Sequence, residues 1–266
     1  TYNFVWNEDN GNGCISNDTV QITFNYIPTS TFTLPSINCF NDTIVVTYTG
    51  NATPQANYNW NFGNAVVVSG VGAGPYAIAY NQTGTFPVSL QITQNGCTSS
   101  TTTLQTTNPE PISLSLSKVD VTCFGYNDGL VSSQVSGGTP PYSYHWNNGS
   151  IFANQTQATA GWYFLTVTDQ NGCKAMADIT VAEPAKLSID MIDSIAICKD
   201  STITISSSAT GGTSPYTYQW NNGVNSNSIT VSPSTTTIYS LIVKDSHQCI
   251  AQKSVKVYVY PPLNFT

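Results

Sequence analysis

Seven cysteines are the side chains of this 266-residue chain with the clearest capacity for chemistry, and they fall into two periodic series. Members of each series recur every 75 to 84 residues. No two of them have the CxxC spacing typical of zinc sites, so the pattern favours disulfides over a metal centre. One series, in which each cysteine follows a polar turn, comprises Cys14, Cys97, Cys173 and Cys249; the other comprises Cys39, Cys123 and Cys198.

The alternation of the two series predicts one disulfide inside each repeating unit. The expected pairs are Cys39–Cys97, Cys123–Cys173 and Cys198–Cys249. Each pair would close a loop of about 50 to 60 residues and stabilise a small domain by about 4 kcal/mol. Cys14 would then be left unpaired through truncation, because its partner would lie upstream of residue 1. Disulfides form in oxidising compartments, so the chain is expected to be exported.

Residues that could support catalysis do not converge on a motif. His145 and His247 lie far apart in the sequence, and Asn59 and Gln219 occupy the position of His145 in the other units. The acidic residues are scattered, so we expect no enzyme and no catalytic residues.

Two aspartates are candidate calcium ligands. Asp128 and Asp169, together with Asp120, offer hard oxygen atoms near a domain end, where calcium could stiffen a junction. The alternative is that these side chains cap turns, and Asp245 at the position of Asp169 fits that interpretation equally well. Calcium is the one cofactor that the sequence suggests.

The cysteines must be positioned by strands. Alternating aromatic residues end in Trp146, and Trp60 and Trp220 stand at the same place in the other units, 21 to 23 residues after a cysteine. About seven short strands per unit indicate an all-β chain of tandem immunoglobulin-like, Greek-key β-sandwiches with one disulfide each. Because the second cysteine follows a hairpin, the bridge is expected at the end of the sandwich, and an antibody-type topology is not expected.

Prolines mark the seams between units. We predict a C-terminal remnant of a preceding sandwich, three complete units and the start of a further one. Their ranges are 1–28, 29–109, 110–184, 185–262 and 263–266.

Charge and hydropathy exclude several classes of partner. The net charge is -7, the isoelectric point is about 4.4, and no basic run occurs. These features argue against nucleic acid or anionic lipid as a ligand. No apolar run approaches the ~20 residues of a membrane helix, so no insertion is expected.

The middle unit contains three distinctive segments, around Cys123-Phe124-Gly125, Gly137-Gly138-Thr139 and Asn171-Gly172-Cys173. In these segments it resembles the SprB repeat of very large surface proteins of Bacteroidetes, including a gliding-motility adhesin. The third unit keeps Gly211-Gly212-Thr213, and the looser first unit resembles the PKD-like modules that accompany such repeats. The resemblance implies export by the type IX system and display at the outer surface.

Two further sets of residues are candidate surface sites. Trp162 and Phe164 alternate with inward residues, so they should face outward, where they could contact a glycan or partner or pack under a loop. Asp-Ser/Thr-aliphatic (or Thr) triplets resemble the O-glycosylation acceptor of Bacteroidetes; the acceptor hydroxyls would be Thr19, Thr43, Ser194 and Ser201.

These observations together predict the repeat region of a secreted or cell-surface bacterial adhesin, acting as stalk and adhesive surface. Its partners would be other domains of the same long chain and surface glycans or a substratum. Two alternatives stay open: passive spacer domains of a type IX-secreted protein, and a structural subunit of an extracellular filament.

Overall fold

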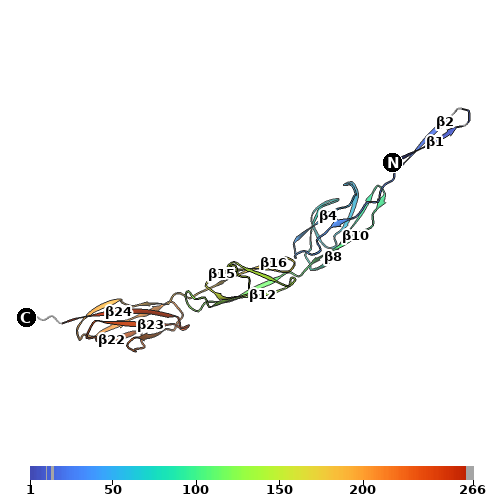
Figure 1. Ribbon diagram of the computed structural model, residues 1–266. Coiled ribbons are helices and arrows are strands. Elements are labelled where there is room, and N and C mark those ends of the chain that lie inside the picture. The colour runs from blue at the N-terminus through green and yellow to red at the C-terminus, as the bar shows by residue number, and fades with distance from the viewer. Residues whose placement is uncertain (10, 13–14, 262–266) are drawn as a thin grey trace, which may run out of the picture. The chain divides into compact units, whose positions relative to one another are not determined.

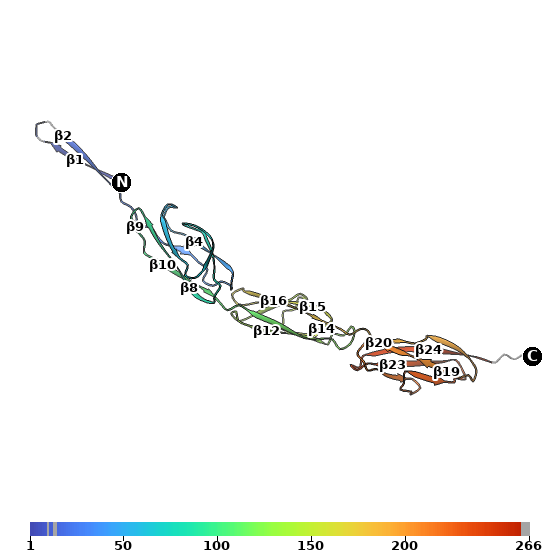
Figure 2. The same ribbon diagram turned by 180° about the vertical axis from the view of Figure 1, so that it is seen from behind.

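The computed structural model describes residues 1–9, 11–12 and 15–261, and all of its regular elements are strands (Figures 1 and 2). Among these residues no helix is long and apolar enough to cross a membrane. The all-β prediction is confirmed. The chain forms two compact units. Unit 1 consists of Thr1–Ile112, Gly137–Tyr142 and Thr168–Cys173, and unit 2 consists of Ser113–Ser136, Ser143–Val167 and the described residues from Lys174 onward. This division cuts the second repeat, so the predicted repeat limits stay predictions.

Unit 1 opens with a two-stranded hairpin and continues into the first repeat. The hairpin pairs β1 (Tyr2–Asp9) with β2 (Ile15–Ile22), and its side chains are exposed. One sheet of the first repeat has the order β3-β4-β7-β6, and the other has the order β10-β8-β5 with β9 beside β8. These strands are β3 (Phe32–Thr33), β4 (Thr43–Tyr48), β5 (Asn57–Asn61), β6 (Val66–Ser69), β7 (Tyr76–Ala79), β8 (Gly84–Gln94), β9 (Cys97–Thr98) and β10 (Thr102–Asn108).

The second repeat has two three-stranded sheets, ordered β11-β12-β14 and β13-β15-β16. Alternating burial along β15 shows why a strand forms here, since Tyr163, Leu165 and Val167 are buried while the residues between them are more exposed. The strands are β11 (Ser113–Val119), β12 (Gly129–Ser136), β13 (Ser143–Trp146), β14 (Gln155–Ala158), β15 (Gly161–Thr168) and β16 (Lys174–Val181).

The third repeat lies wholly in unit 2 and has three sheets. Their orders are β18-β24-β23-β21, β19-β22 and β17-β20, and β18 runs parallel to β24. The strands are β17 (Ser188–Asp190), β18 (Ser194–Cys198), β19 (Ile203–Ser206), β20 (Ser208–Thr210), β21 (Thr217–Trp220), β22 (Ser228–Val231), β23 (Thr237–Lys244) and β24 (Ile250–Tyr260).

The strand order identifies the topology. In the first repeat the main strands other than the short β9, taken in chain order as A to G, form one sheet A-B-E-D and another C-F-G. This is the order of constant-type immunoglobulin domains. The expectation that an antibody-type topology would be absent is therefore wrong for strand order. The immunoglobulin-like prediction is confirmed, although the cysteines do not occupy the antibody positions on B and F.

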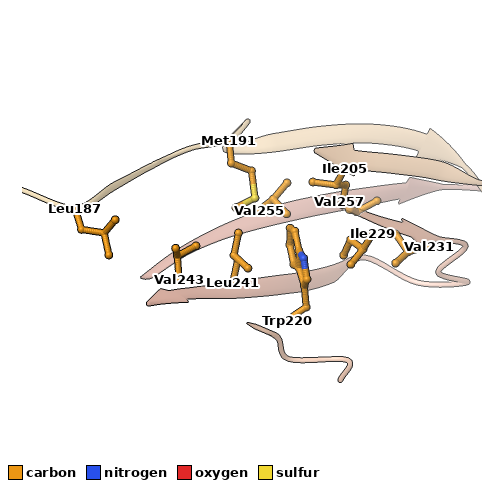
Figure 3. Close-up of a cluster of buried hydrophobic side chains, with 10 residues drawn as sticks. All are labelled: Leu187, Met191, Ile205, Trp220, Ile229, Val231, Leu241, Val243, Val255 and Val257. Carbon is orange, nitrogen blue, oxygen red and sulfur yellow. The ribbon is translucent and has the colours of Figure 1, made fainter. Parts of the chain in front are cut away.

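The second and third repeats bury a tryptophan from the equivalent of strand C, whereas Trp60 of the first repeat is half-buried. In the third repeat, Figure 3 shows the Trp220 ring among aliphatic side chains, with Leu241 of β23 and Val255 of β24 nearby. Trp146 and Trp220 are 0% and 2% exposed, and their indole N–H groups donate to the carbonyl oxygens of Phe152 (2.8 Å) and Ser226 (2.9 Å). The ring is thus removed from water without leaving its polar group unpaired.

Candidate functional site: cysteines at the ends of the repeats

The three cysteines that open the repeats sit in one type of turn. The carbonyl oxygens of Cys39, Cys123 and Cys198 each accept a hydrogen bond from the N–H three residues later, at 3.0, 3.1 and 3.1 Å. The residue two positions after each cysteine has a positive φ, 64°, 76° and 68° respectively. A positive φ at the third residue is the mark of a type II turn.

Each of these turns lies beside the C-terminal end of the last strand of its own repeat. Neighbouring N–H groups donate to that strand end: Asn38 to Thr107 (2.9 Å), Val121 to Ala182 (3.1 Å) and Lys199 to Tyr260 (2.9 Å). We call this place, where the chain leaves a repeat, the exit end.

The cysteines of the other series follow the hairpin that begins the last strand. The residue before each of them, Gly96, Gly172 or Gln248, has a positive φ of 80°, 84° or 65°. In the second and third repeats, the Gly-Gly turn at this end is bonded to the preceding seam in the same way. The N–H of Gly138 donates to Glu110 (3.0 Å), and that of Gly212 donates to Ala185 (2.7 Å). We call this place, where the chain enters a repeat, the entry end.

Two disulfides join an exit end to the entry end of the following repeat. Cys39 bonds to Cys173 within unit 1, and Cys123 bonds to Cys249 within unit 2, with Cα–Cα distances of 5.4 and 5.6 Å. Cys97 and Cys198 carry free thiols. The predicted pairs Cys39–Cys97, Cys123–Cys173 and Cys198–Cys249 are therefore wrong. Cys14 lies outside the described residues.

The length of the last strand explains why the predicted pairs do not form. In the third repeat, β24 begins directly after Cys249 and ends at Tyr260, which is the register partner of Cys198. Eleven residues of strand span about 35 Å. A disulfide requires Cα atoms within about 7 Å, so the two cysteines of one repeat cannot meet. Cysteines at the facing ends of consecutive repeats can.

The Gly-Gly-Thr segment builds the entry end. A Cβ atom on Gly137 would lie 2.1 Å from the carbonyl oxygen of Pro111, and one on Gly211 would lie 2.1 Å from that of Lys186. Only glycine permits this approach of the seam. Tyr216 donates its hydroxyl to the Gly211 carbonyl oxygen (2.7 Å), as Tyr142 does to that of Gly137 (2.6 Å). Sequence reasoning missed this packing, although the spacing of Gly-Gly in two repeats was its signal.

A buried aspartate organises each of these two entry ends. Asp169 accepts hydrogen bonds from the N–H groups of Thr139, Asn171 and Cys173, each at 2.9 Å. Asp245 accepts the equivalent bonds from Thr213 (2.8 Å), His247 (2.9 Å) and Cys249 (2.9 Å). Burial raises the pKa of the Asp245 carboxyl, but the three N–H donors outweigh burial and hold that pKa below its ordinary value.

The calcium candidates are engaged in such bonds. Asp128 accepts from both the N–H (3.1 Å) and the hydroxyl of Thr122, and these two bonds lower its pKa. Asp120 accepts from Lys118 and from the N–H of Ala182. In the described ranges no three His, Cys, Asp or Glu side chains converge as metal ligands. The carboxylates act as turn and seam acceptors here, while calcium binding by Asp128 or Asp169 stays a prediction.

The aromatic candidates form a stacked pair on β15, in which Trp162 is exposed and Phe164 is half-buried. Trp162 is 55% exposed and stacks on Phe164, with ring centroids 5.6 Å apart and an interplanar angle of 28°. The Trp162 indole N–H donates to Asp178 on β16 at 3.0 Å. A fixed aromatic platform beside a carboxylate is a surface on which a sugar ring can stack. Ile238 and Ser240 stand in the equivalent places on β23, and Pro87 and Ser89 stand in those on β8, so neither other repeat has an aromatic pair there.

The remaining candidates lie on separate surfaces. Thr19, Thr43 and Ser194 are exposed and Ser201 is half-buried, so their hydroxyl groups are reachable for glycosylation. His145 is exposed on β13. The structure does not bring these residues together.

Comparisons with known proteins give one family match. The family model of the SprB repeat matches residues 115–151 and 197–225, about a quarter of the chain. Both segments contain an opening cysteine turn and end just beyond Trp146 or Trp220. Curated protein sequences give no match.

Several solved structures of multidomain proteins are similar to this chain. The N-terminal eight Ig domains of Down syndrome cell adhesion molecule match with a TM-score of 0.49 at 11% identity, covering 92% of this chain and 38% of that one. A three-domain titin fragment, I67–I69, matches at 0.38 and 10% identity, covering 88% and 98%. Drosophila N-cadherin EC1–4 matches at 0.31 and 9% identity, covering 96% and 82%. This chain therefore spans well under half of the first of these structures. On its own strand order, the chain is a tandem of immunoglobulin-like β-sandwiches, and two of its segments match the model of the SprB repeat.

Proposed function

We propose that this chain is part of the repeat region of a bacterial cell-surface adhesin, exported by the type IX system, in which the repeats form a covalently reinforced stalk and also present an adhesive surface. The observation that carries the proposal is that both disulfides join consecutive repeats rather than closing single ones. A bridge at a junction resists separation of neighbouring repeats, which is the requirement of a stalk under tension. The SprB match supports a surface location and a part in gliding motility.

The adhesive role rests on the Trp162–Phe164 pair. Trp162 is exposed and Phe164 is half-buried, and the pair is held by its own stacking and by the bond to Asp178. The stacked Trp60–Phe62 pair of the first repeat is half-buried at both rings. Glycans of a surface or substratum are the partners that suit an aromatic face beside hydrogen-bonding groups. O-linked sugars on Thr19, Thr43, Ser194 or Ser201 would hydrate a chain in which only 8% of residues are charged.

The test is binding of the whole chain to bacterial cells, a glycan array and glass. We expect binding that Trp162→Ala reduces at least about tenfold, since loss of one stacking residue removes on the order of 1.5 kcal/mol. Phe152→Ala is the matched control, because Phe152 is 74% exposed in the same repeat but lies outside the pair.

Two other outcomes would favour the alternative functions, a passive spacer and a filament subunit. A chain that binds none of these surfaces is a passive spacer, and the adhesive part of the proposal is then wrong. Concentration-dependent polymers that bury Trp162 would instead show a filament subunit.

A further inference from the structure

The described residues include two free thiols, one from each cysteine series. Cys198 is the opening cysteine of the third repeat and is exposed, whereas its bonded counterpart Cys123 is 4% exposed. Cys97 is the closing cysteine of the first repeat and is half-buried. The other members of both series in the described residues are all bonded.

The surroundings of Cys198 reproduce those of the bonded opening cysteines. Its carbonyl oxygen accepts the N–H of Ser201 at 3.1 Å, and Asp200 has a φ of 68°. Cys198 is paired in register with Tyr260, the last residue of β24, so it lies at the exit end. Cys39 and Cys123 have the same turn at the same end, and each bonds a closing cysteine.

The surroundings of Cys97 match those of a closing cysteine. The Cys97 thiol lies 3.9 Å from the carbonyl oxygen of Asn25, in the segment that leads into the first repeat. Asn25 also donates its side-chain amide to the carbonyl oxygen of Asn95 at 3.2 Å. At the entry end of the third repeat, Cys249 likewise lies beside the incoming residues Lys186 and Leu187.

We propose that Cys198 is one half of a third disulfide, whose other half is the closing cysteine of a further repeat of this kind docked at the exit end of the third repeat. By the same pairing rule, Cys97 forms a disulfide with the opening cysteine of a repeat that docks at the entry end of the first repeat. The occupant is a β-sandwich repeat that presents a cysteine after its last hairpin. One disulfide would then join the consecutive repeats at each junction.

The bond forms by thiol–disulfide exchange. A thiolate attacks a small disulfide oxidant such as oxidised glutathione and releases one glutathione thiol. The second cysteine thiolate then displaces the other glutathione. Two cysteine thiols are oxidised, one glutathione disulfide is reduced to two thiols, and two protons move from the cysteines to the glutathione thiolates.

The test extends the chain after Pro262 by a copy of its own residues 185–262. The copy carries Ser in place of its own equivalent of Cys198, so that the Cys198 peptide occurs once in the extended chain. It supplies a closing cysteine equivalent to Cys249 and an entry end equivalent to that of the third repeat. After refolding with oxidised and reduced glutathione, disulfides are assigned by peptide mass mapping. We expect Cys198 to bond the copied Cys249, and alkylation of Cys198 by iodoacetamide to fall from nearly complete in the unextended chain to nearly none.

Formation of Cys123–Cys249 in the same molecules shows that the other repeats have folded. A Ser in place of the copied Cys249 is the control and should restore alkylation of Cys198. If Cys198 stays alkylatable while Cys123–Cys249 forms, the proposal is overturned. A dimer joined by Cys198 of one molecule and Cys198 of another would also overturn it, because two opening cysteines would then be paired.

Discussion

The ionised carboxyl group of Asp245 stabilises the entry end of the third repeat. Its carboxyl group is 2% exposed and accepts three N–H groups from the entry end of the third repeat. One of those groups belongs to Cys249, so the carboxylate also orients the bridged cysteine. A buried carboxylate is stable only with such donors around it.

The lowered pKa of Asp245 gives the third repeat a defined response to acid. Above the ordinary carboxyl pKa of 3.8, the residue is ionised in the folded and unfolded states, and its full contribution to stability is present. As the pH falls below that value, the unfolded chain takes up the proton first. The contribution is therefore lost as the pH drops through the lowered pKa of the folded state.

We expect Asp245→Asn to destabilise the third repeat by about 1–3 kcal/mol at pH 7, because the amide nitrogen would face N–H donors and the charge is lost. The difference from the unmodified chain should shrink as the pH is lowered from 4 to 2. Hydrogen exchange of the β23 and β24 amides in urea measures both quantities. Asp193→Asn is the control, since its side chain is 87% exposed and pairs only with Lys253 at the surface, where the pair contributes little. Equal losses in the two variants would contradict this account.

At the scale of elements, the Gly-Gly turn decides how closely a seam packs on its repeat. Gly211 has a φ of 73°, and a Cβ atom there would meet the Lys186 carbonyl oxygen at 2.1 Å. Gly223, in the turn after β21, has a φ of 86° with open space around its Cβ position. Both glycines therefore need a left-handed backbone conformation, but only at Gly211 does another part of the backbone approach the Cβ position closely.

This difference predicts the effect of alanine at each place. Gly223→Ala should cost about 1–2 kcal/mol, the strain of a left-handed residue. Gly211→Ala should cost a further 1–3 kcal/mol or so, because backbone must move to admit the methyl group. Urea unfolding of both variants, with the cysteines oxidised, measures the two losses. Similar losses of stability in the two variants would show that the backbone at Lys186 moves away from the added methyl group at no cost in free energy.

Many of the strands and turns can be predicted from the sequence. The disulfide pairing cannot, because it depends on how residues far apart in the chain are placed. Alternating side chains around Trp146 and Trp220 locate buried strands, because strand period is a local property. The turns at the cysteines are also local. Which cysteines meet depends on β18 running parallel to β24 and placing Cys198 at the far end from Cys249. Periodicity carries no information on that placement, so the other cysteine of the same repeat is the wrong partner.

At the scale of the whole chain, the two disulfides close overlapping loops. Cys123 lies inside the loop closed by Cys39–Cys173, and Cys173 lies inside the loop closed by Cys123–Cys249. A chain pulled from its ends transmits tension through the shorter covalent path, which crosses both bridges. Most of the first repeat then lies off this path. Tension therefore bypasses the first repeat as long as Cys39–Cys173 is intact.

Overlapping loops set the extension that a stretched molecule can reach. The shorter path contains about 105 residues, so we expect the fully unfolded, oxidised chain to stop at about 370 Å and the reduced chain at about 930 Å. Single-molecule force spectroscopy on the whole chain measures both limits. Cys123→Ser distinguishes the pairing schemes: loss of Cys123–Cys249 lengthens the path by roughly 90 Å, whereas loss of a bridge inside the second repeat would lengthen it by roughly 170 Å. An increase near the larger value would show that each repeat closes on itself, and tension would then pass through every repeat in turn.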